Sequence, residues 1–290
     1  MNVVMGVTGK VGGAVARTLL AADKPVRAVV RDAAKGAPWA ERGCEVAVAD
    51  LDDADRMAAA FAGAEAAFVM LPPMFDPSPG FPEARAMIAK LRQALDGSRL
   101  RRVVALSTVG ADCERPNLLN QLGLLERALE DLPMPVAFLR AAWFMENAAW
   151  DVAAARDLGT IQSYLQPLDH PVPMISASDV GRVAAELMGE TWTGHRVVEL
   201  EAERVTSNAI AQALAEALGR PVRVEAIPRE RWEAIFRAEG MQNPLPRIQM
   251  VDGFNQGWID FPDRGASARR GAISLKQAIA EMVVAASVDA

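Results

Sequence analysis

Three glycines near the start of the chain have the spacing of a phosphate-binding turn. In the stretch GVTGKVG, two residues separate Gly6 from Gly9 and Gly9 from Gly12. A turn that lacks Cβ atoms lets backbone amides approach a pyrophosphate at the N-terminus of a helix. The alternative is a glycine-rich connection that binds nothing. The stretch follows a β-branched run at 2–4 and precedes a run with helical spacing, and this context favours a dinucleotide-binding turn.

The end of the second predicted strand carries residues that distinguish the two nicotinamide dinucleotides. It reads AVVRD, so Arg31 and Asp32 are adjacent. An aspartate at this place binds the ribose of NAD, whereas a planar guanidinium suits the 2′-phosphate of NADP. Because Arg31 comes first, the sequence favours NADP(H), with NAD(H) as the alternative. After the third strand, Asp50 either reaches the adenine edge or caps the helix that begins at Asp53.

Strand-like and helix-like runs alternate through the first half of the chain. The predicted strands are 2–5, 26–30, 44–48, 66–71, 102–106 and 136–139. The predicted helices are 12–22, 54–61, 83–95 and 118–132. This alternation is typical of βαβ units and predicts an α/β fold with a doubly wound parallel Rossmann sheet.

After residue 140 the alternation loosens. Prolines cluster between 167 and 173, a capped helix start is predicted at 178–181, and strands at 197–200 and 222–226 flank a helix at 207–218. We therefore predict a small α+β C-terminal subdomain built from 159–175 and 191–290. The dinucleotide-binding domain would consist of 1–158, with 176–190 returning to it.

Composition excludes several classes of protein. The chain has 290 residues, of which 51% are hydrophobic and 23% charged, as expected of a soluble globular protein. Its apolar runs have only strand length, and no leader-like segment opens it, so a cytoplasmic protein without a membrane partner is expected. A net charge of −6 argues against general nucleic-acid binding. With two cysteines and two histidines, we expect free thiols and no metal centre.

Several motifs together resemble the NmrA-like branch of the atypical short-chain dehydrogenases/reductases. They are GVTGKVG, VVRD, ADLDD after the third strand, LPP at 71–73, LSTVGA at 106–111, LRAAWFMEN at 139–147 and ALGRPVRVEAIP at 217–228. The resemblance implies an NAD(P)-binding Rossmann domain and a small C-terminal subdomain over a cleft. Members of this branch include quinone and azo-dye reductases, isoflavone reductase-like enzymes, and regulators that bind the nucleotide without catalysis.

The resemblance also implies which positions meet the cofactor. From the pyrophosphate to the nicotinamide they are Gly6, Thr8, Gly9, Lys10, Val11 and Gly12, then Arg31, Asp50, Leu51, Leu71 and Pro72, and finally Thr108, Trp143, Phe144 and Asn147. For Trp143 and Phe144, packing in the core is the alternative. The segments 164–176 and 241–261 are expected to line the substrate cleft.

The proton donor of conventional alcohol dehydrogenases is absent. Those enzymes use Tyr-x-x-x-Lys, in which the lysine lowers the pKa of the tyrosine. The single tyrosine, Tyr164, is followed four residues later by Leu168. Related reductases place a lysine in the helix after LSTVGA, and Leu122 occupies that place. A conventional alcohol dehydrogenase is therefore not expected.

Two functions remain consistent with a nucleotide site that lacks this acid. The first is an NADPH-dependent oxidoreductase acting on a quinone-like or other conjugated small-molecule acceptor, whose reduced form takes its proton from solvent. Four side chains are candidates to donate a hydrogen bond to the acceptor: Ser107, Gln121, Asn147 and His170. Glu126 is expected to anchor its helix to neighbouring backbone. The alternative is a non-catalytic NADP(H) sensor that acts through a regulatory protein partner.

Overall fold

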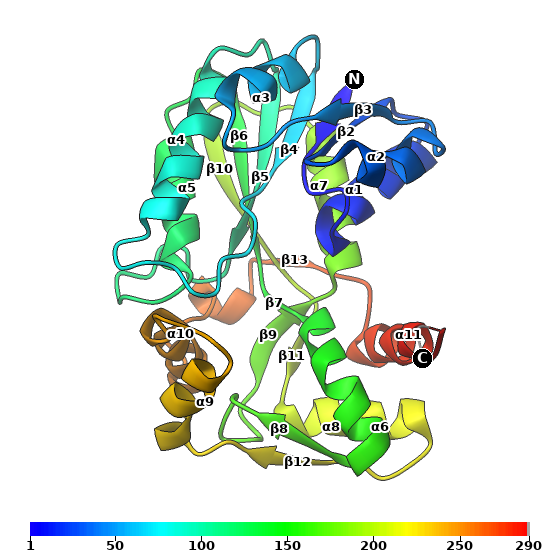
Figure 1. The fold of residues 1–290 in the computed structure, drawn as a ribbon, viewed down its shortest axis with the longest axis vertical. Helices are drawn as coiled ribbons and strands as arrows, with labels where there is room; N and C mark the ends of the chain where they lie inside the picture. The colour runs from blue at the N-terminus through cyan, green and yellow to red at the C-terminus, as the bar shows by residue number, and fades with distance from the viewer. Residues whose placement is uncertain (289–290) are drawn as a thin grey trace. The chain divides into compact units, whose positions relative to one another are not determined.

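The computed structural model describes residues 1–288 and contains one large sheet (Figure 1). Its strands follow the order β13-β10-β6-β5-β4-β1-β2-β3. They are β1 (Asn2–Val4), β2 (Val26–Val30), β3 (Glu45–Val48), β4 (Ala66–Val69), β5 (Arg102–Thr108), β6 (Val136–Ala141), β10 (His195–Glu201) and β13 (Arg269–Arg270). The pairs from β3 through β5 are all parallel. This is the doubly wound Rossmann sheet that the alternation predicts, with its strand order reversing between β1 and β4.

The chain divides into two compact units. The first consists of 1–112, 119–140 and 177–198, and the second of 113–118, 141–176 and 199–290. The strands β6 and β10 begin in the first unit and end in the second. The strand predicted at 197–200 is β10, and it joins the large sheet beside β6. The domain boundaries predicted from the sequence stay a prediction.

Helices cover both faces of the sheet in the first unit (Figure 1). They are α1 (Lys10–Ala21), α2 (Ala33–Ala40), α3 (Ala54–Phe61), α4 (Pro82–Asp96), α5 (Asn120–Leu129) and α7 (Ala177–Gly189). On one face α1 packs against α7, and on the other α4 packs against both α3 and α5. A Cβ on Gly181 of α7 would lie 2.3 Å from the Cβ of Ala14, so the close approach of α1 and α7 requires glycine there.

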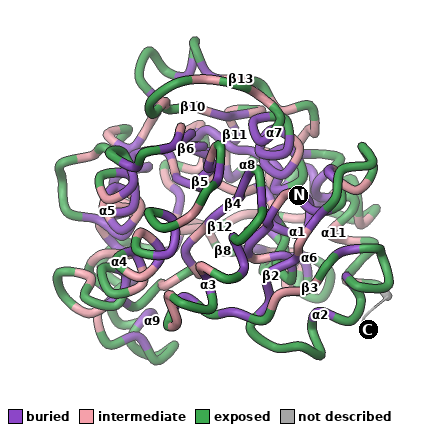
Figure 2. Tube along the Cα trace, turned by 90° about the horizontal axis from the view of Figure 1, so that it is seen from above, coloured by how far each residue is buried: buried purple, intermediate pink, exposed green. Residues whose placement is uncertain are grey.

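The central strands are buried along most of their length, as the purple segments of Figure 2 show. Parallel strands covered on both faces read as continuous apolar runs, and β4 and β6 are buried at every residue. One large cluster of buried side chains joins these strands to α3, α4 and α5, with Phe61, Leu91 and Leu125 among its members. The sheet is thereby a rigid support for the loops that leave its edge.

The second unit contains two small sheets and several helices. The sheets have the orders β11-β9-β7 and β12-β8. Their strands are β7 (Trp143–Phe144), β8 (Thr160–Ser163), β9 (Val172–Ile175), β11 (Glu203–Val205) and β12 (Arg223–Ala226). The helices are α6 (Val152–Leu158), α8 (Ser207–Leu218), α9 (Trp232–Ala238), α10 (Leu245–Gln256) and α11 (Leu275–Val288), with short 3-10 helices η1 (Met145–Asp151), η2 (Arg229–Arg231) and η3 (Pro262–Gly265). This mixed composition agrees with the predicted α+β character.

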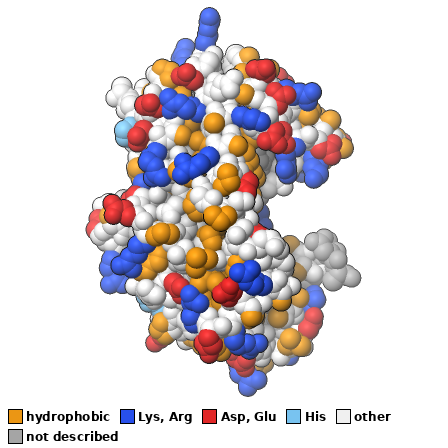
Figure 3. Space-filling view, turned by 60° about the vertical axis from the view of Figure 1, so that its left-hand side comes forward, with side chains coloured by type: hydrophobic (Ala, Val, Ile, Leu, Met, Phe, Trp, Pro, Cys, Tyr) orange, Lys and Arg blue, Asp and Glu red, His pale blue; other side chains and the backbone are white. Residues whose placement is uncertain are grey.

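Three properties of residues 1–288 bear on the classes of protein considered above. Neither Cys44 nor Cys113 forms a disulfide there. Within residues 1–288, no helix is long and apolar enough to cross a membrane. On the face of the described chain shown in Figure 3, basic and acidic side chains are interspersed and form no stripe of a single sign.

Candidate functional site

Five parallel strands of the first unit end at one edge of the sheet. The turn from Gly6 to Gly12 follows β1, Arg31 follows β2, and Asp50 with Leu51 follows β3. Leu71 and Pro72 follow β4, and Thr108 is the last residue of β5. The structure therefore brings these predicted positions to one edge, at the point where the strand order reverses. Nucleotides bind at this place in doubly wound sheets.

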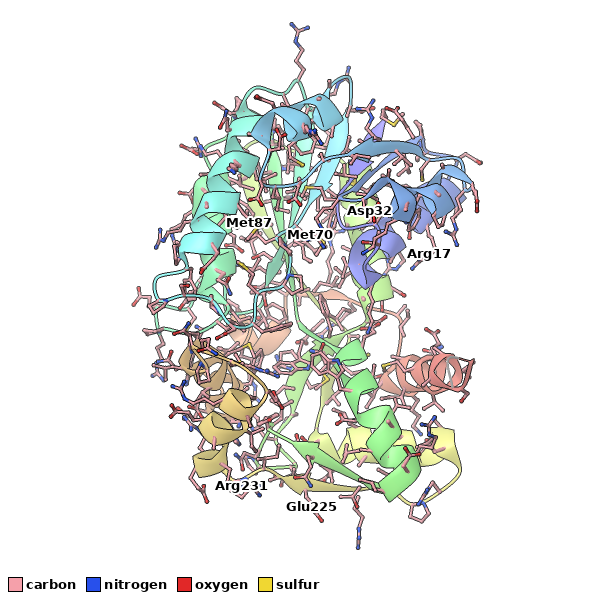
Figure 4. All side chains as sticks on the ribbon, viewed as in Figure 1. Arg17, Asp32, Met70, Met87, Glu225 and Arg231 are labelled. Carbon is pink, nitrogen blue, oxygen red and sulfur yellow. The ribbon has the colours of Figure 1, made fainter. Side chains whose placement is uncertain are left out.

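Two glycines of the turn are required by the fold itself. Gly6 has a φ of 67°, and a Cβ there would lie 2.6 Å from the Sδ atom of Met70, which Figure 4 labels at the end of β4. A Cβ on Gly12 would lie 2.3 Å from the carbonyl oxygen of Gly6. Both positions let the turn fold back against the strand ends, whether or not a ligand is present.

Gly9 differs from these two glycines. Its φ of −98° is open to any residue, and a Cβ would meet only the carbonyl oxygen of Gly6, at an ordinary 3.4 Å. The residue is exposed and caps the N-terminus of α1 without a side-chain hydrogen bond. The amides of Val11 and Gly12 lie in the first turn of α1, which offers them no intrahelical acceptor. This open, electropositive surface fits a pyrophosphate.

The adjacent residues Arg31 and Asp32 have different surroundings. The Oδ1 atom of Asp32 accepts a hydrogen bond from the backbone N–H of Ala34 at 2.9 Å and so caps α2. The side chain of Arg31 is exposed and makes no hydrogen bond or ion pair with any residue between 1 and 288. The carboxylate is engaged within the protein, whereas the guanidinium is available to a ligand.

The residues after β3 and β4 divide between the surface and the core. Asp50 is exposed, and its Oδ1 atom lies 3.4 Å from the backbone nitrogen of Asp52. The cap of α3 is Asp53, which accepts from the N–H of Arg56 at 3.0 Å, so the alternative that Asp50 caps this helix is wrong. Leu51 and Leu71 belong to the buried core cluster. Pro72 and Thr108 are half-buried at the sheet edge.

The two residues compared with a Tyr-x-x-x-Lys pair, Tyr164 and Leu122, both pack against other side chains of their own unit. Tyr164 belongs to the second unit and packs against Trp232 and Phe236, with ring centroids 5.6 and 4.9 Å away. Burial is the main reason that the pKa of its phenol is raised. Leu122, in the place of the expected lysine, packs on the apolar core of the first unit.

Ser107 belongs to a buried network in which its hydroxyl already has an acceptor. Its hydroxyl donates to the Oε1 atom of Glu126, and Glu126 accepts two further bonds from Arg140, at 2.9 and 2.7 Å. Arg140 also contacts Asp112 at 2.6 Å. Burial acts to lower the pKa of Arg140, but the Glu126 and Asp112 carboxylates raise it overall. Glu126 therefore anchors α5 through side chains, not through neighbouring backbone as expected.

Gln121 lies on α5 and is also buried. Its Nε2 atom donates to the carbonyl oxygen of Met74 at 3.2 Å, which ties the connection after β4 to this helix. The amide thus has a structural partner within the first unit. Its predicted role toward an acceptor stays a prediction.

Three predicted cofactor positions belong to the second unit. Trp143 and Phe144 form β7, which pairs with β9. The indole of Trp143 meets the ring of Phe254 edge-on, with centroids 5.0 Å apart, so packing accounts for this residue within its unit. Asn147 lies half-buried in η1.

The fourth donor candidate, His170, lines a cavity of about 430 Å³ within the second unit. The cavity wall comes from 170–173 and from 254–264, which overlap the two segments predicted to line a substrate cleft. Phe254, Asp260, Phe261 and Arg264 contribute to it. The aromatic composition of 241–261 was a usable signal for this wall, but no local pattern marks Arg264. A volume of this size is typical of small-molecule sites.

Residues 6–191 match the model of a family described as NAD(P)H-binding. The chain belongs to this NAD(P)H-binding family. The match spans the glycine turn and all five strand ends described above, and it confirms the NAD(P)-binding Rossmann domain that the resemblance implies. The individual cofactor positions and hydrogen-bond donors stay predictions.

The chain is also similar to individual proteins across most of its length. An NAD(P)H azoreductase from Xenophilus azovorans is 29% identical over 247 residues, which cover 84% of this chain and 83% of the relative. Two solved structures share the fold with a TM-score of 0.80. They are a triphenylmethane reductase from Citrobacter sp. (20% identity, 98% of this chain and 99% of the other) and an NADPH-dependent quinone oxidoreductase from Escherichia coli (21% identity, 97% and 99%).

Proposed function

We propose that this protein is an NADPH-dependent reductase that transfers a hydride to a conjugated acceptor such as a quinone or an azo compound. Three relatives with this general chemistry support the proposal: the azoreductase, the triphenylmethane reductase and the quinone oxidoreductase. All three are named as reductases or oxidoreductases, which favours the reductase over the non-catalytic sensor.

The observation that carries the cofactor assignment is the contrast between Arg31 and Asp32. The carboxylate that would bind the ribose hydroxyls of NAD instead caps α2. The neighbouring guanidinium is exposed at the same sheet edge and suits the 2′-phosphate of NADP. Lys35, which the sequence analysis did not single out, is exposed in the first turn of α2, where the helix has no acidic residue. It adds a second positive charge four residues after Arg31.

The missing acid selects the class of acceptor. Bound NADPH supplies a hydride, which carries two electrons to the acceptor. An isolated carbonyl would become a localised alkoxide, and this chain has no Tyr-x-x-x-Lys pair to protonate it. A quinone becomes an oxyanion delocalised over its ring, and an azo group becomes a conjugated nitrogen anion. Water can protonate either product after transfer, so no fixed acid is required.

Steady-state oxidation of NADPH with a panel of quinones and azo compounds tests the proposal. We expect protein-dependent turnover that Gly9→Asp abolishes, because the new carboxylate would occupy the pyrophosphate surface. Gly189→Asp is the matched control, since Gly189 is exposed in open space at the end of α7. Tight NADPH binding without turnover on any acceptor would contradict the reductase and favour the sensor.

A further inference from the structure

The cavity of the second unit has a wall suited to a planar aromatic molecule. Phe254, Ile259 and Phe261 contribute apolar side chains, and Pro171 and Pro173 face the same space. The cavity volume of about 430 Å³ lies within the range of small-molecule sites. Flat aromatic ligands bury well against such walls because they lose little conformational freedom on binding.

Two carboxylates border this cavity, and both are engaged within the protein. Asp260 accepts two bonds from Arg204, each 2.8 Å long, and a third from the backbone N–H of Phe261 at 2.8 Å. Asp263 accepts from the hydroxyl of Ser267 at 2.7 Å. That hydroxyl, together with backbone N–H groups of 265–267, lowers the pKa of Asp263. These acceptors are therefore satisfied without a ligand.

The other two polar side chains on the wall, His170 and Arg264, can both donate hydrogen bonds. The side chains of His170 and Arg264 make no hydrogen bond or ion pair with any residue that the structure describes. Imidazole donates through one nitrogen when neutral, and guanidinium only donates. A ligand that completes this cavity must therefore bring oxygen acceptors, and the free guanidinium favours a negatively charged one.

The backbone that presents Arg264 is strained. Asp263 and Arg264 adopt φ values of 46° and 55°, in the left-handed region that non-glycine residues avoid. Fixed contacts hold both ends of this turn. Asp260 is bound to Arg204, and the carbonyl of Gly265 accepts from Arg270 at 2.9 Å. Strained residues of this kind persist where their surroundings over-determine them, and they concentrate at ligand clamps.

We propose that this cavity binds an aromatic carboxylate, with the ring against Phe254 and Phe261 and the carboxylate on Arg264. The inference rests on the proposed function only in that the bound molecule would be the acceptor, or part of it. Binding itself requires neither NADPH nor turnover. The strained turn would then hold the backbone of Arg264 in place before the ligand arrives, with its exposed side chain free to reach the carboxylate.

Calorimetric titration of the full-length protein without nucleotide tests this site, with 2-naphthoate and its neutral isostere 2-naphthamide as probes. We expect the carboxylate to bind about tenfold more tightly than the amide, because it pairs with a guanidinium. Arg264→Gln should remove this preference, and Arg264→Lys should retain most of it. Arg231→Gln is the matched control. Arg231, labelled in Figure 4, is exposed just before α9 and is not among the residues that line the cavity.

Equal affinity for the two probes, or a preference that survives Arg264→Gln, would overturn the proposal. So would the absence of naphthoate binding. Circular dichroism of each variant separates loss of the site from loss of the fold. Titration of the same samples with NADPH separates this inference from the proposed function, because a protein that binds NADPH but not naphthoate retains the first and lacks the second.

Discussion

Asp32 and Ala34 are joined by a 2.9 Å hydrogen bond from the backbone N–H of Ala34 to the carboxylate of Asp32. This bond makes Asp32 the cap of α2 and leaves Arg31 as the charged side chain that faces outward at the end of β2. Asp32→Ala should therefore destabilise the fold by about 1 kcal/mol, and its NADPH affinity should change little. Urea denaturation and calorimetry measure the two effects.

Asp32→Ser is the control for that substitution. Serine caps helices as well as aspartate but carries no charge, so the variant should keep both stability and nucleotide binding. A tenfold loss of NADH affinity in Asp32→Ser at unchanged stability would show that the carboxylate binds ribose.

The glycines of the turn should separate stability from binding. Gly12→Ala places a Cβ against backbone and should cost about 3 kcal/mol or more. Gly9→Ala meets no such clash, and the poorer capping by alanine offsets the lower entropy of its unfolded chain, so stability should change by less than about 1 kcal/mol. It should nevertheless lower NADPH affinity at least tenfold, because the new methyl group stands where the pyrophosphate would lie. Unchanged affinity in Gly9→Ala would contradict this placement.

The ion pair between Glu126 and Arg140 should contribute to stability more than to chemistry. Within residues 1–288, Glu126→Ala leaves Arg140 with only the exposed Asp112 as a partner and should cost about 3 to 5 kcal/mol. The double variant Glu126→Leu, Arg140→Met removes both charges and should be more stable than the two single effects predict together. Denaturant titrations of Glu126→Leu, Arg140→Met and the double variant measure the coupling. Simple additivity would mean that the buried pair is not coupled.

Asp151 should make stability depend on pH. Burial raises the pKa of its carboxyl from 3.8 to about 6. The folded protein therefore holds a proton that the unfolded chain has released between these two values, and stability falls as the pH rises through this window. Asp151→Asn should remove the penalty and stabilise the protein at pH 7 by up to about 3 kcal/mol, with little effect at pH 4.

The exposed Asp157, paired with Arg156 in the same unit, provides the matched control. Asp157→Asn should have nearly the same small effect at both pH values. If Asp151→Asn stabilises equally at pH 4 and pH 7, its effect does not come from titration of the carboxyl.

The first unit was largely predictable from the sequence, because its order depends on local signals. The run at 2–4, the glycine turn and the helical spacing that follows correspond to β1 and α1 almost residue for residue. The helix α2 was not predicted, since AAKGAPWA contains Gly36 and Pro38, both poor in helices. Tertiary packing explains it. A Cβ on Gly36 would lie 2.6 Å from a side-chain methyl of Val46, so glycine permits α2 to lie close to β3.

Other features depend on contacts that no local pattern encodes. The strand β10 has an ordinary strand sequence, and its place beside β6 is decided by the arrangement of the whole sheet. The buried residues of α10 do not follow a single helical stripe, so periodicity gave no sign of it. Ser107, Glu126 and Arg140 come from three separate elements. Only the assembled first unit shows that the hydroxyl expected to meet an acceptor is bonded to a carboxylate.

The most direct test of the central claim is a calorimetric titration with NADPH, NADP⁺, NADH and NAD⁺, on the wild type and on Arg31→Gln. Arg99→Gln is the control. Arg99 is exposed in the connection before β5, at the opposite end of that strand from Thr108. We expect the phosphorylated pair to bind at least tenfold more tightly, about 1.4 kcal/mol, and Arg31→Gln to abolish that difference without weakening NADH. Equal binding of all four dinucleotides to the wild type, or a preference that survives Arg31→Gln, would contradict the account.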